Sequence, residues 1–246
     1  AAVLKYRMPN GHPEVPLEDV EQALRIMMGL EAGATGFTAG KVGIVGSSAG
    51  GHLAASASTL AETKPAFSIL FYPVITAEKG KGHQGSFNAL LGGSRNAESD
   101  TWYSLQNRVT AQTPPTLLLL SDDDKVVPPV NGILYYNALK EHGVKASMHI
   151  YPTGGHGWGI RDRFKYKEQW QQATLDWLKE LNDDRNTASV LLRQPGLPGC
   201  VDVGIRPATS RKSAGRELAE AVVQAAVQEF GQQVRSRRES DWPAGQ

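Results

Sequence analysis

Apolar and polar positions follow two different periods along this chain. Short apolar runs, typical of strands buried in a sheet, occur at 42–45, 67–72, 116–120 and 145–151, and a further strand is expected at 3–8. Between them, apolar residues recur every three or four positions, as in amphipathic helices, at 17–30, 49–60, 130–142 and 166–181. Strands that alternate with helices indicate the α/β class, a predominantly parallel sheet with helices on both faces.

Two stretches depart from this alternation. Residues 73–113 are polar and rich in turn residues, with short helical pieces near 88–91 and 99–105; a connection of this length is either a functional insertion, such as a lid, or a solvated loop. After residue 182 the basic residues change from mostly lysine to mostly arginine, and an amphipathic helix is expected at 213–235. We therefore predict a domain of residues 1–182 and an arginine-rich tail, 183–246, whose helix packs on that domain or on a second copy.

Composition narrows the classes of function. The 246 residues carry a net charge of +1, which gives no reason to expect nucleic acid or an anionic membrane as a partner. A single cysteine excludes an intrachain disulfide, and the histidines share no metal-ligand spacing, so neither a metal nor another cofactor is expected. No apolar run reaches the ~18 residues of a membrane span. The first residues do not resemble a signal peptide, and the compartment stays open.

The stretch 42–53 carries the strongest chemical signal. It reads as strand, tight turn and helix, and the turn contains Gly46-x-Ser48-x-Gly50, the spacing of a nucleophile elbow. Glycines let the backbone bend sharply at such a turn, which lifts the Ser48 hydroxyl clear of the sheet. The alternative is a glycine-rich turn without chemistry, because this spacing also arises by chance in a glycine-rich chain.

A serine nucleophile needs a base, and the base needs a carboxylate that fixes its tautomer. After a nucleophile elbow these partners follow in the order Asp or Glu and then His. The strand at 116–120 runs into three acidic residues at 122–124, and the strand at 145–151 runs into a glycine-rich loop that holds His156. Because ligands bind at the carboxyl ends of parallel strands, this order and placement predict a Ser–Asp–His site.

Three motifs together resemble the α/β-hydrolase superfamily, and above all its acetyl-esterase and carboxylesterase branch near acetyl xylan esterases. They are Gly-Ser-Ser-Ala-Gly-Gly-His-Leu at 46–53, Asp124-x-x-Val-Pro, and Tyr-Pro-x-Gly-Gly-His-Gly-Trp-Gly at 151–159, and the resemblance runs from about residue 2 to 182. It implies that Ser48 is the nucleophile, His156 the base and Asp124 the carboxylate, since the spacing to Val-Pro selects Asp124 over its two acidic neighbours. The amide of Ala49 is implied as one oxyanion donor. His52, one helical turn past Ser48, is expected to be a packed neighbour rather than a catalyst.

The chain departs from that family in two ways. A His-Gly-Gly loop, which supplies further oxyanion amides in the family, does not occur in this sequence, and the arginine-rich tail does not resemble the family. We therefore expect an α/β-hydrolase fold that lacks its first strands and an enzyme that hydrolyses acetate esters slowly, because oxyanion donors are missing. An exposed strand edge or the tail helix is then expected to pair with a second copy.

The resemblance implies a serine esterase that removes short acyl groups, acetyl above all, from carbohydrate such as acetylated xylan. Its partner would be a small-molecule or oligosaccharide ester. Candidate substrate contacts are His83 and Trp102 in the segment 73–113, and Trp158 beside the base. Two alternatives stay open: a serine peptidase of the prolyl-oligopeptidase type, which shares the elbow, and a catalytically impaired fragment or binding module.

Overall fold

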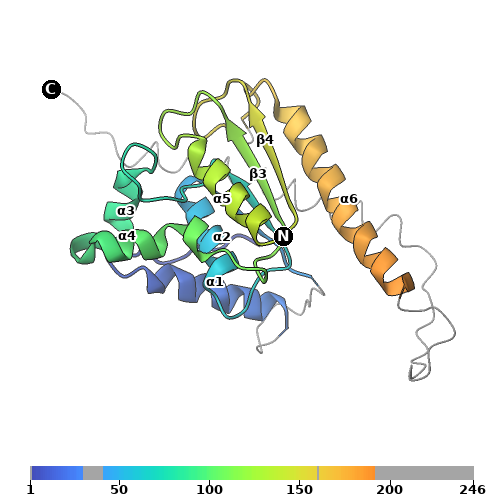
Figure 1. The fold of residues 1–246 in the computed structure, drawn as a ribbon, viewed down its shortest axis with the longest axis horizontal. Coiled ribbons are helices and arrows are strands. Elements are labelled where there is room, and N and C mark those ends of the chain that lie inside the picture. The colour runs from blue at the N-terminus through green and yellow to red at the C-terminus, as the bar shows by residue number, and fades with distance from the viewer. Residues whose placement is uncertain (1, 30–40, 160, 192–246) are drawn as a thin grey trace. The chain divides into compact units, whose positions relative to one another are not determined.

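The computed structural model describes residues 2–29, 41–159 and 161–191, with 183–191 described by their backbone alone (Figure 1). In these residues four parallel strands form the sheet. The strands lie in the order β1 (Ile44–Ser47), β2 (Ser68–Phe71), β3 (Thr116–Ser121) and β4 (Ala146–Tyr151). The register aligns Ser47 with Phe71, Phe71 with Leu119, and Ser121 with Tyr151. The carboxyl ends of all four strands therefore lie along one edge of the sheet.

Helices fill the connections between the strands. Helix α1 precedes β1, α2 joins β1 to β2, and α5 joins β3 to β4, while the long connection from β2 to β3 holds two helices and two 3₁₀ turns. The bounds are α1 (Glu14–Met27), α2 (Ser48–Thr59), α3 (Gln84–Leu91), η1 (Gly92–Ser94), α4 (Ala97–Tyr103), η2 (Leu105–Arg108), α5 (Val130–Glu141) and α6 (Lys167–Leu191). This parallel sheet with packed helices confirms the predicted fold class.

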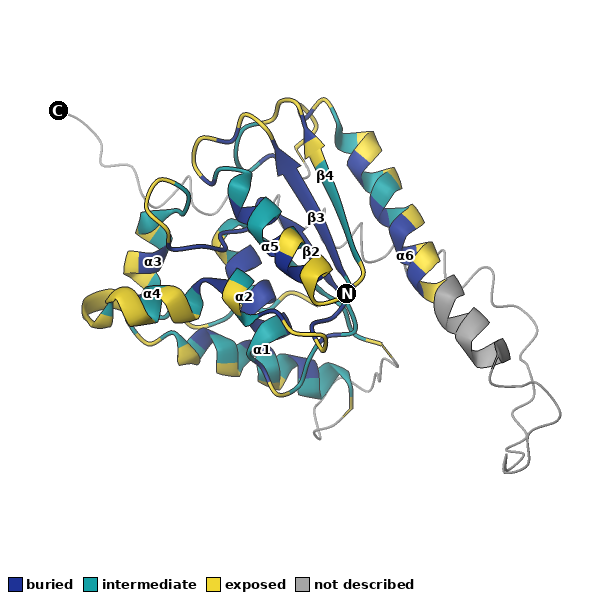
Figure 2. Ribbon diagram, viewed as in Figure 1, coloured by how far each residue is buried: buried dark blue, intermediate teal, exposed yellow. Residues whose placement is uncertain are grey.

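The centre of the sheet is buried, as its continuous apolar runs predict (Figure 2). Leu117, Leu118 and Leu119 of β3 expose no surface. On one face of the sheet, side chains of α2 and α5 share a core cluster with Leu70 of β2 and Leu118 of β3. Burying a leucine side chain contributes about 1.5–3 kcal/mol. This cluster holds the strand ends, and with them the loops that follow, in a fixed arrangement.

The segment 73–113 is an ordered part of the domain, with apolar residues of its own in the core. Phe87 and Leu91 of α3 are buried in a second cluster with Val74. The side-chain oxygen of Asn131 accepts hydrogen bonds from the N–H groups of Ile75 and Thr76, at 3.0 and 3.2 Å. The segment is therefore a packed insertion, and the reading as a solvated loop is wrong.

The strand expected at 3–8 is not formed. Arg7 binds α1 instead: its guanidinium and its backbone N–H both donate to the carboxylate of Asp19, at 2.7–3.1 Å. Val3 and Met8 are about half exposed, at 52% and 60%. A strand was predicted here, but in the described residues the segment is bound to the first helix and is not part of the sheet.

The chain divides into two compact units, residues 2–166 and the residues from Lys167 on. Of the second unit the structure describes α6, whose residues Trp170, Thr174, Trp177, Leu178 and Leu181 are buried at helical spacing. The helix was expected to end at residue 181 but continues to Leu191, because no proline or glycine interrupts the sequence there. The helix expected at 213–235 lies outside the described residues, and the domain boundary after residue 182 stays a prediction.

Candidate active site

Ser48 lies at the turn between β1 and α2. Its φ of +53° is in the left-handed region, which residues with a Cβ rarely adopt. A Cβ at Gly46 would collide with the carbonyl oxygen of Gly50, so only glycine lets the strand and the helix meet so closely. The N–H of Val74 donates to the Ser48 carbonyl at 3.0 Å and anchors the turn. The strand, tight turn and helix expected around the nucleophile elbow are confirmed.

Two of the acidic residues after β3 have distinct environments. Asp124 is buried, and its Oδ1 accepts hydrogen bonds from the N–H groups of Val126 and Val127, both at 2.9 Å. Asp123 is exposed, and its Oδ1 accepts from the N–H of Gly155 at 2.7 Å. The Asp-x-x-Val spacing therefore has a physical basis, because the chain after Asp124 folds back to place two amides on one carboxylate oxygen.

His156 joins the other two predicted residues. Its Nδ1 lies 2.7 Å from Oδ2 of Asp124, and its Nε2 lies 2.8 Å from Oγ of Ser48. An ionised carboxylate only accepts, so this bonding assigns the ring proton to Nδ1 and leaves Nε2 free to accept the Ser48 hydroxyl proton. Gly155, with a φ of +61°, makes the turn that presents the ring. The three side chains thus form one continuous chain of hydrogen bonds at the carboxyl edge of the sheet.

Tyr72, which the sequence reasoning missed, packs against this chain. It is buried and follows β2 directly, with an unusual φ of +36°. Its ring meets the imidazole of His156 edge-on, with centroids 4.8 Å apart. Its hydroxyl is hydrogen-bonded to the Ser47 side chain and the Gly159 backbone, and burial raises its pKa far above the usual range. Tyr72 therefore stays protonated and ties the elbow to the histidine loop.

His52 is a packed residue, as predicted. Its Nε2–H donates to the carbonyl of Tyr103 at 2.9 Å, its Nδ1 lies 3.4 Å from Oγ of Ser56, and its ring meets Phe87 edge-on. Burial lowers its pKa from 6.5 to about 4, only partly opposed by the hydrogen bond to the Tyr103 carbonyl. A neutral imidazole satisfies both partners, so His52 links α2 to α4 without an exposed proton to transfer.

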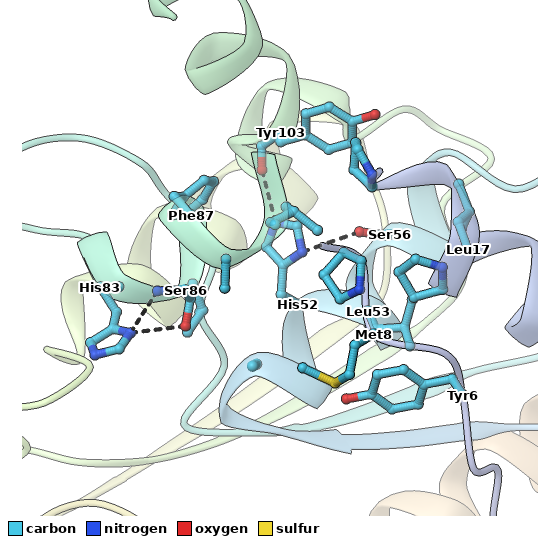
Figure 3. Close-up of a pocket in the computed structure, with 18 of the residues that line it drawn as sticks. Tyr6, Met8, Leu17, His52, Leu53, Ser56, His83, Ser86, Phe87 and Tyr103 are labelled. Carbon is cyan, nitrogen blue, oxygen red and sulfur yellow. Dashed lines mark hydrogen bonds between the residues drawn. The ribbon is translucent and has the colours of Figure 1, made fainter. Parts of the chain in front are cut away.

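An apolar cavity of about 260 Å³ opens beside α2 (Figure 3). Ala49 and His52 line it, and so does His83, one of the predicted substrate contacts. Nδ1 of His83 accepts from the N–H of Ser86 and lies 2.8 Å from its hydroxyl, so this ring caps α3. The other walls are mostly apolar, with Met8, Pro13, Leu17, Leu53, Phe87 and Leu90 among them. His83 is thus near the elbow but has a structural partner of its own.

The two predicted tryptophan contacts have different surroundings. Trp102 is 49% exposed, and the guanidinium of Arg108 lies 3.8 Å above its ring. Trp158 is only 3% exposed and is stacked on Phe164, with centroids 4.1 Å apart, while Tyr72 meets it edge-on. Trp158 therefore packs within the histidine loop, and little of its surface is exposed.

Neither a metal site nor a membrane span is seen in the described residues. No group of three or more His, Cys, Asp or Glu side chains is placed there to hold a metal ion. None of the described helices is long and apolar enough to cross a membrane.

A parallel sheet whose strand-to-helix turn presents a serine, with His and Asp on the loops after later strands, defines an α/β-hydrolase. The chain belongs to the prolyl oligopeptidase family, Peptidase_S9, whose family profile matches residues 15–184. The resemblance to the acetyl-esterase branch of the superfamily is confirmed by the relatives that follow.

Among curated proteins, the chain is 42% identical over 185 residues to an acetylxylan esterase of Xylanibacter ruminicola, covering 73% of this chain and 38% of that protein. It is 32% identical over 155 residues to endo-1,4-beta-xylanase B of Butyrivibrio fibrisolvens, covering 58% and 24%. The chain thus spans less than half the length of these curated relatives. Among solved structures, the acetyl ester-xyloside bifunctional hydrolase of Caldicellulosiruptor lactoaceticus matches with a TM-score of 0.66 and 33% identity, covering 73% of this chain and 71% of that one.

Proposed function

We propose that this chain carries the active site of a serine esterase that removes acetyl and other short acyl groups from carbohydrate, acetylated xylan above all. The observation that carries the proposal is the continuous hydrogen bonding from Ser48 through His156 to Asp124, at 2.8 and 2.7 Å. In this proposal Ser48 is the nucleophile, His156 the general base and acid, and Asp124 the carboxylate that orients the imidazole.

Acylation follows from the tautomer that Asp124 fixes. As Oγ of Ser48 attacks the carbonyl carbon of the ester, its proton passes to Nε2 of His156, and Asp124 stabilises the resulting imidazolium. The tetrahedral adduct then collapses, the bond from carbon to the alcohol oxygen breaks, and His156 returns the proton to that oxygen. The products of this half-reaction are the free alcohol and an acyl group on Ser48.

Deacylation repeats these steps with water. His156 takes a proton from the water as it attacks the acyl carbon, and returns it to Oγ of Ser48 as the carboxylic acid leaves. We assign one oxyanion donor to the N–H of Ala49, the second residue of α2. The first N–H groups of a helix have no acceptor within that helix, and the helix dipole favours negative charge at that end.

Two comparisons favour esters of carbohydrate over peptides. The relative named as an acetylxylan esterase is 42% identical, and the solved structure matched at 33% identity is named as an acetyl ester-xyloside hydrolase. The prolyl oligopeptidase family takes its name from peptidases. A Ser–His–Asp site can hydrolyse an ester bond or a peptide bond. Peptide hydrolysis is therefore the second candidate function, and the test includes a peptide substrate.

The test compares three substrates on the full chain and on Ser48→Ala. We expect release of p-nitrophenol from p-nitrophenyl acetate, release of acetate from acetylated xylan, and no cleavage of a proline-containing peptide p-nitroanilide. Ser48→Ala should lose all ester turnover and all labelling by an organophosphonate. Cleavage of the peptide p-nitroanilide with no release of acetate would refute the esterase function and support the peptidase function instead. Labelling that survives in Ser48→Ala would refute the assignment of the nucleophile.

A further inference from the structure

A second cavity, of about 230 Å³, lies within the loop that carries His156. We call it the basic cavity, because three of the side chains that line it are cationic. Its walls include Thr153, His156, Trp158, Arg161, Arg163 and Lys165. Since His156 belongs both to this cavity and to the hydrogen-bonded chain with Ser48, a ligand in the basic cavity lies next to the reacting ester.

The turn that presents the cations is fixed by backbone hydrogen bonds. The N–H of Arg161 donates to the carbonyl of Trp158 at 2.8 Å, and the N–H of Phe164 donates to the carbonyl of Arg161 at 2.9 Å. Phe164 is itself buried against Trp158. A Cβ built on Gly157 would lie 3.9 Å from Nη2 of Arg161, so this guanidinium reaches back over the histidine loop. The cationic side chains therefore belong to a turn that backbone hydrogen bonds and the burial of Phe164 hold in place.

The cations outnumber the acidic residues on this turn, and Nζ of Lys165 also lies 5.6 Å from the centroid of the Tyr166 ring. The ion pairs seen among the described residues involve other cations, and none involves Arg161, Arg163 or Lys165. Asp162 is the acidic residue on the same turn, so residues 161–165 carry a net charge of +2, from three cations and one carboxylate. The acidic loop after β3 is occupied, because Asp124 binds His156 and Asp123 binds the backbone of the histidine loop. The turn that lines the basic cavity thus carries a net positive charge beside the candidate active site.

The chemistry of these groups selects an anion of planar shape. Guanidinium groups bind carboxylates through two parallel hydrogen bonds, and such charge-assisted bonds are the strong ones. At about 230 Å³ the cavity is below the ~300–1,000 Å³ typical of pockets for drug-sized ligands, so it suits a single sugar ring. A sugar ring that carries a planar carboxylate is a uronic acid.

We propose that the basic cavity is a subsite for a uronic acid on the acetylated carbohydrate chain, and that the esterase therefore prefers acidic over neutral oligosaccharides. The proposal rests on the proposed esterase function and adds a class of substrate to it. Arg161 and Arg163 bind the sugar carboxylate, while Lys165 adds positive charge at the rim.

The test compares kcat/KM for two acetylated xylo-oligosaccharides, one with a glucuronic acid branch and one with that carboxyl group reduced to an alcohol. We expect the acidic substrate to be favoured about 10-fold, and the preference to fall as salt is added. Arg163→Gln should bring the ratio of kcat/KM for the acidic substrate to that for the reduced substrate close to one. Arg163→Lys should give a ratio between those of Arg163→Gln and the unaltered chain, because lysine keeps the charge without the two parallel hydrogen bonds. Lys140→Gln, an exposed lysine on α5, is the control and should keep the full ratio.

Each ratio is taken within one variant, so a general loss of activity does not affect it. Equal values of kcat/KM for the two substrates in the unaltered chain would overturn the subsite while leaving the esterase intact. If neither substrate is hydrolysed, the esterase is refuted, and the subsite is then decided by calorimetric binding of the two oligosaccharides to Ser48→Ala. Competition for that site by inorganic phosphate but not by glucuronate would show a phosphate site instead and overturn the proposal.

Discussion

His52 should make the stability of the fold depend on pH. Burial lowers its pKa from 6.5 to about 4, so between these values the unfolded chain binds a proton that the folded chain does not. The free energy of unfolding is then greatest above pH 6.5 and falls as the pH falls through this window. With these two values the loss between pH 7 and pH 5 is about 2 kcal/mol.

Denaturant titrations at pH 7, 6 and 5 on the unaltered chain and on His52→Gln measure this loss. Glutamine keeps a donor for the Tyr103 carbonyl but does not titrate, so its free energy of unfolding should fall by about 2 kcal/mol less over the same range. His149, whose pKa burial also lowers, acts in the same direction but is present in both proteins and cancels in the difference.

The control is His12→Gln, because the side chain of His12 is 71% exposed. In this variant the loss of stability expected from His52 should remain, because its buried imidazole is unchanged. If His52→Gln and the unaltered chain instead lose stability in parallel between pH 7 and pH 5, the imidazole of His52 is not kept neutral by the fold, and the reasoning from its burial is refuted.

Three further predictions concern the site. Asp124→Asn should lower kcat for p-nitrophenyl acetate by about 10³–10⁴-fold, because the wrong histidine tautomer is favoured, while Asp123→Asn should cost far less; equal losses in steady-state kinetics would contradict this choice of carboxylate. Gly46→Ala should lower the free energy of unfolding by about 1–3 kcal/mol in a denaturant titration and abolish organophosphonate labelling, because the added Cβ collides with the backbone of α2. Normal labelling of this variant would show that β1 and α2 do not approach so closely at Gly46. Tyr72→Phe should lower kcat about 2- to 10-fold at constant KM, because the ring stays against His156 but the hydrogen bonds of the hydroxyl to Ser47 and Gly159 are lost; a change in KM alone would argue against a positioning role.

Much of the fold and the candidate site follows from local sequence. The predicted strands include all four strands of the described sheet. The reason is clearest for β2 and β3, which are buried along their whole length and tolerate few polar residues, whereas β1 and β4 are only partly buried. The family resemblance, through its Asp-x-x-Val-Pro motif, selected Asp124, which the structure places against His156. The structure adds the physical reason, because two amides just beyond Asp124 donate to its carboxylate. These features depend on neighbours within a few positions.

What the sequence did not reveal depends on contacts between distant segments. Tyr72 reads as the last residue of a strand, and only the approach of the histidine loop makes it part of the site. The segment 73–113 reads as polar, yet Asn131, far along the chain, binds its backbone. The strand expected at 3–8 was predicted from its local sequence, which does not say whether a partner strand is present. Pairing with a second copy stays a prediction.

The candidate site has one residue near the carboxyl end of every strand in the described sheet. Ser48 follows β1, Tyr72 follows β2, Asp124 lies after β3 and His156 lies after β4. A strand that paired one residue out of register would move its group by about 3.3 Å and turn it to the other face. In the proposed mechanism, the reactivity of Ser48 therefore depends on the register of all four strands. The fraction of chains that an organophosphonate labels is then a count of correctly folded molecules, and it can follow refolding without any substrate.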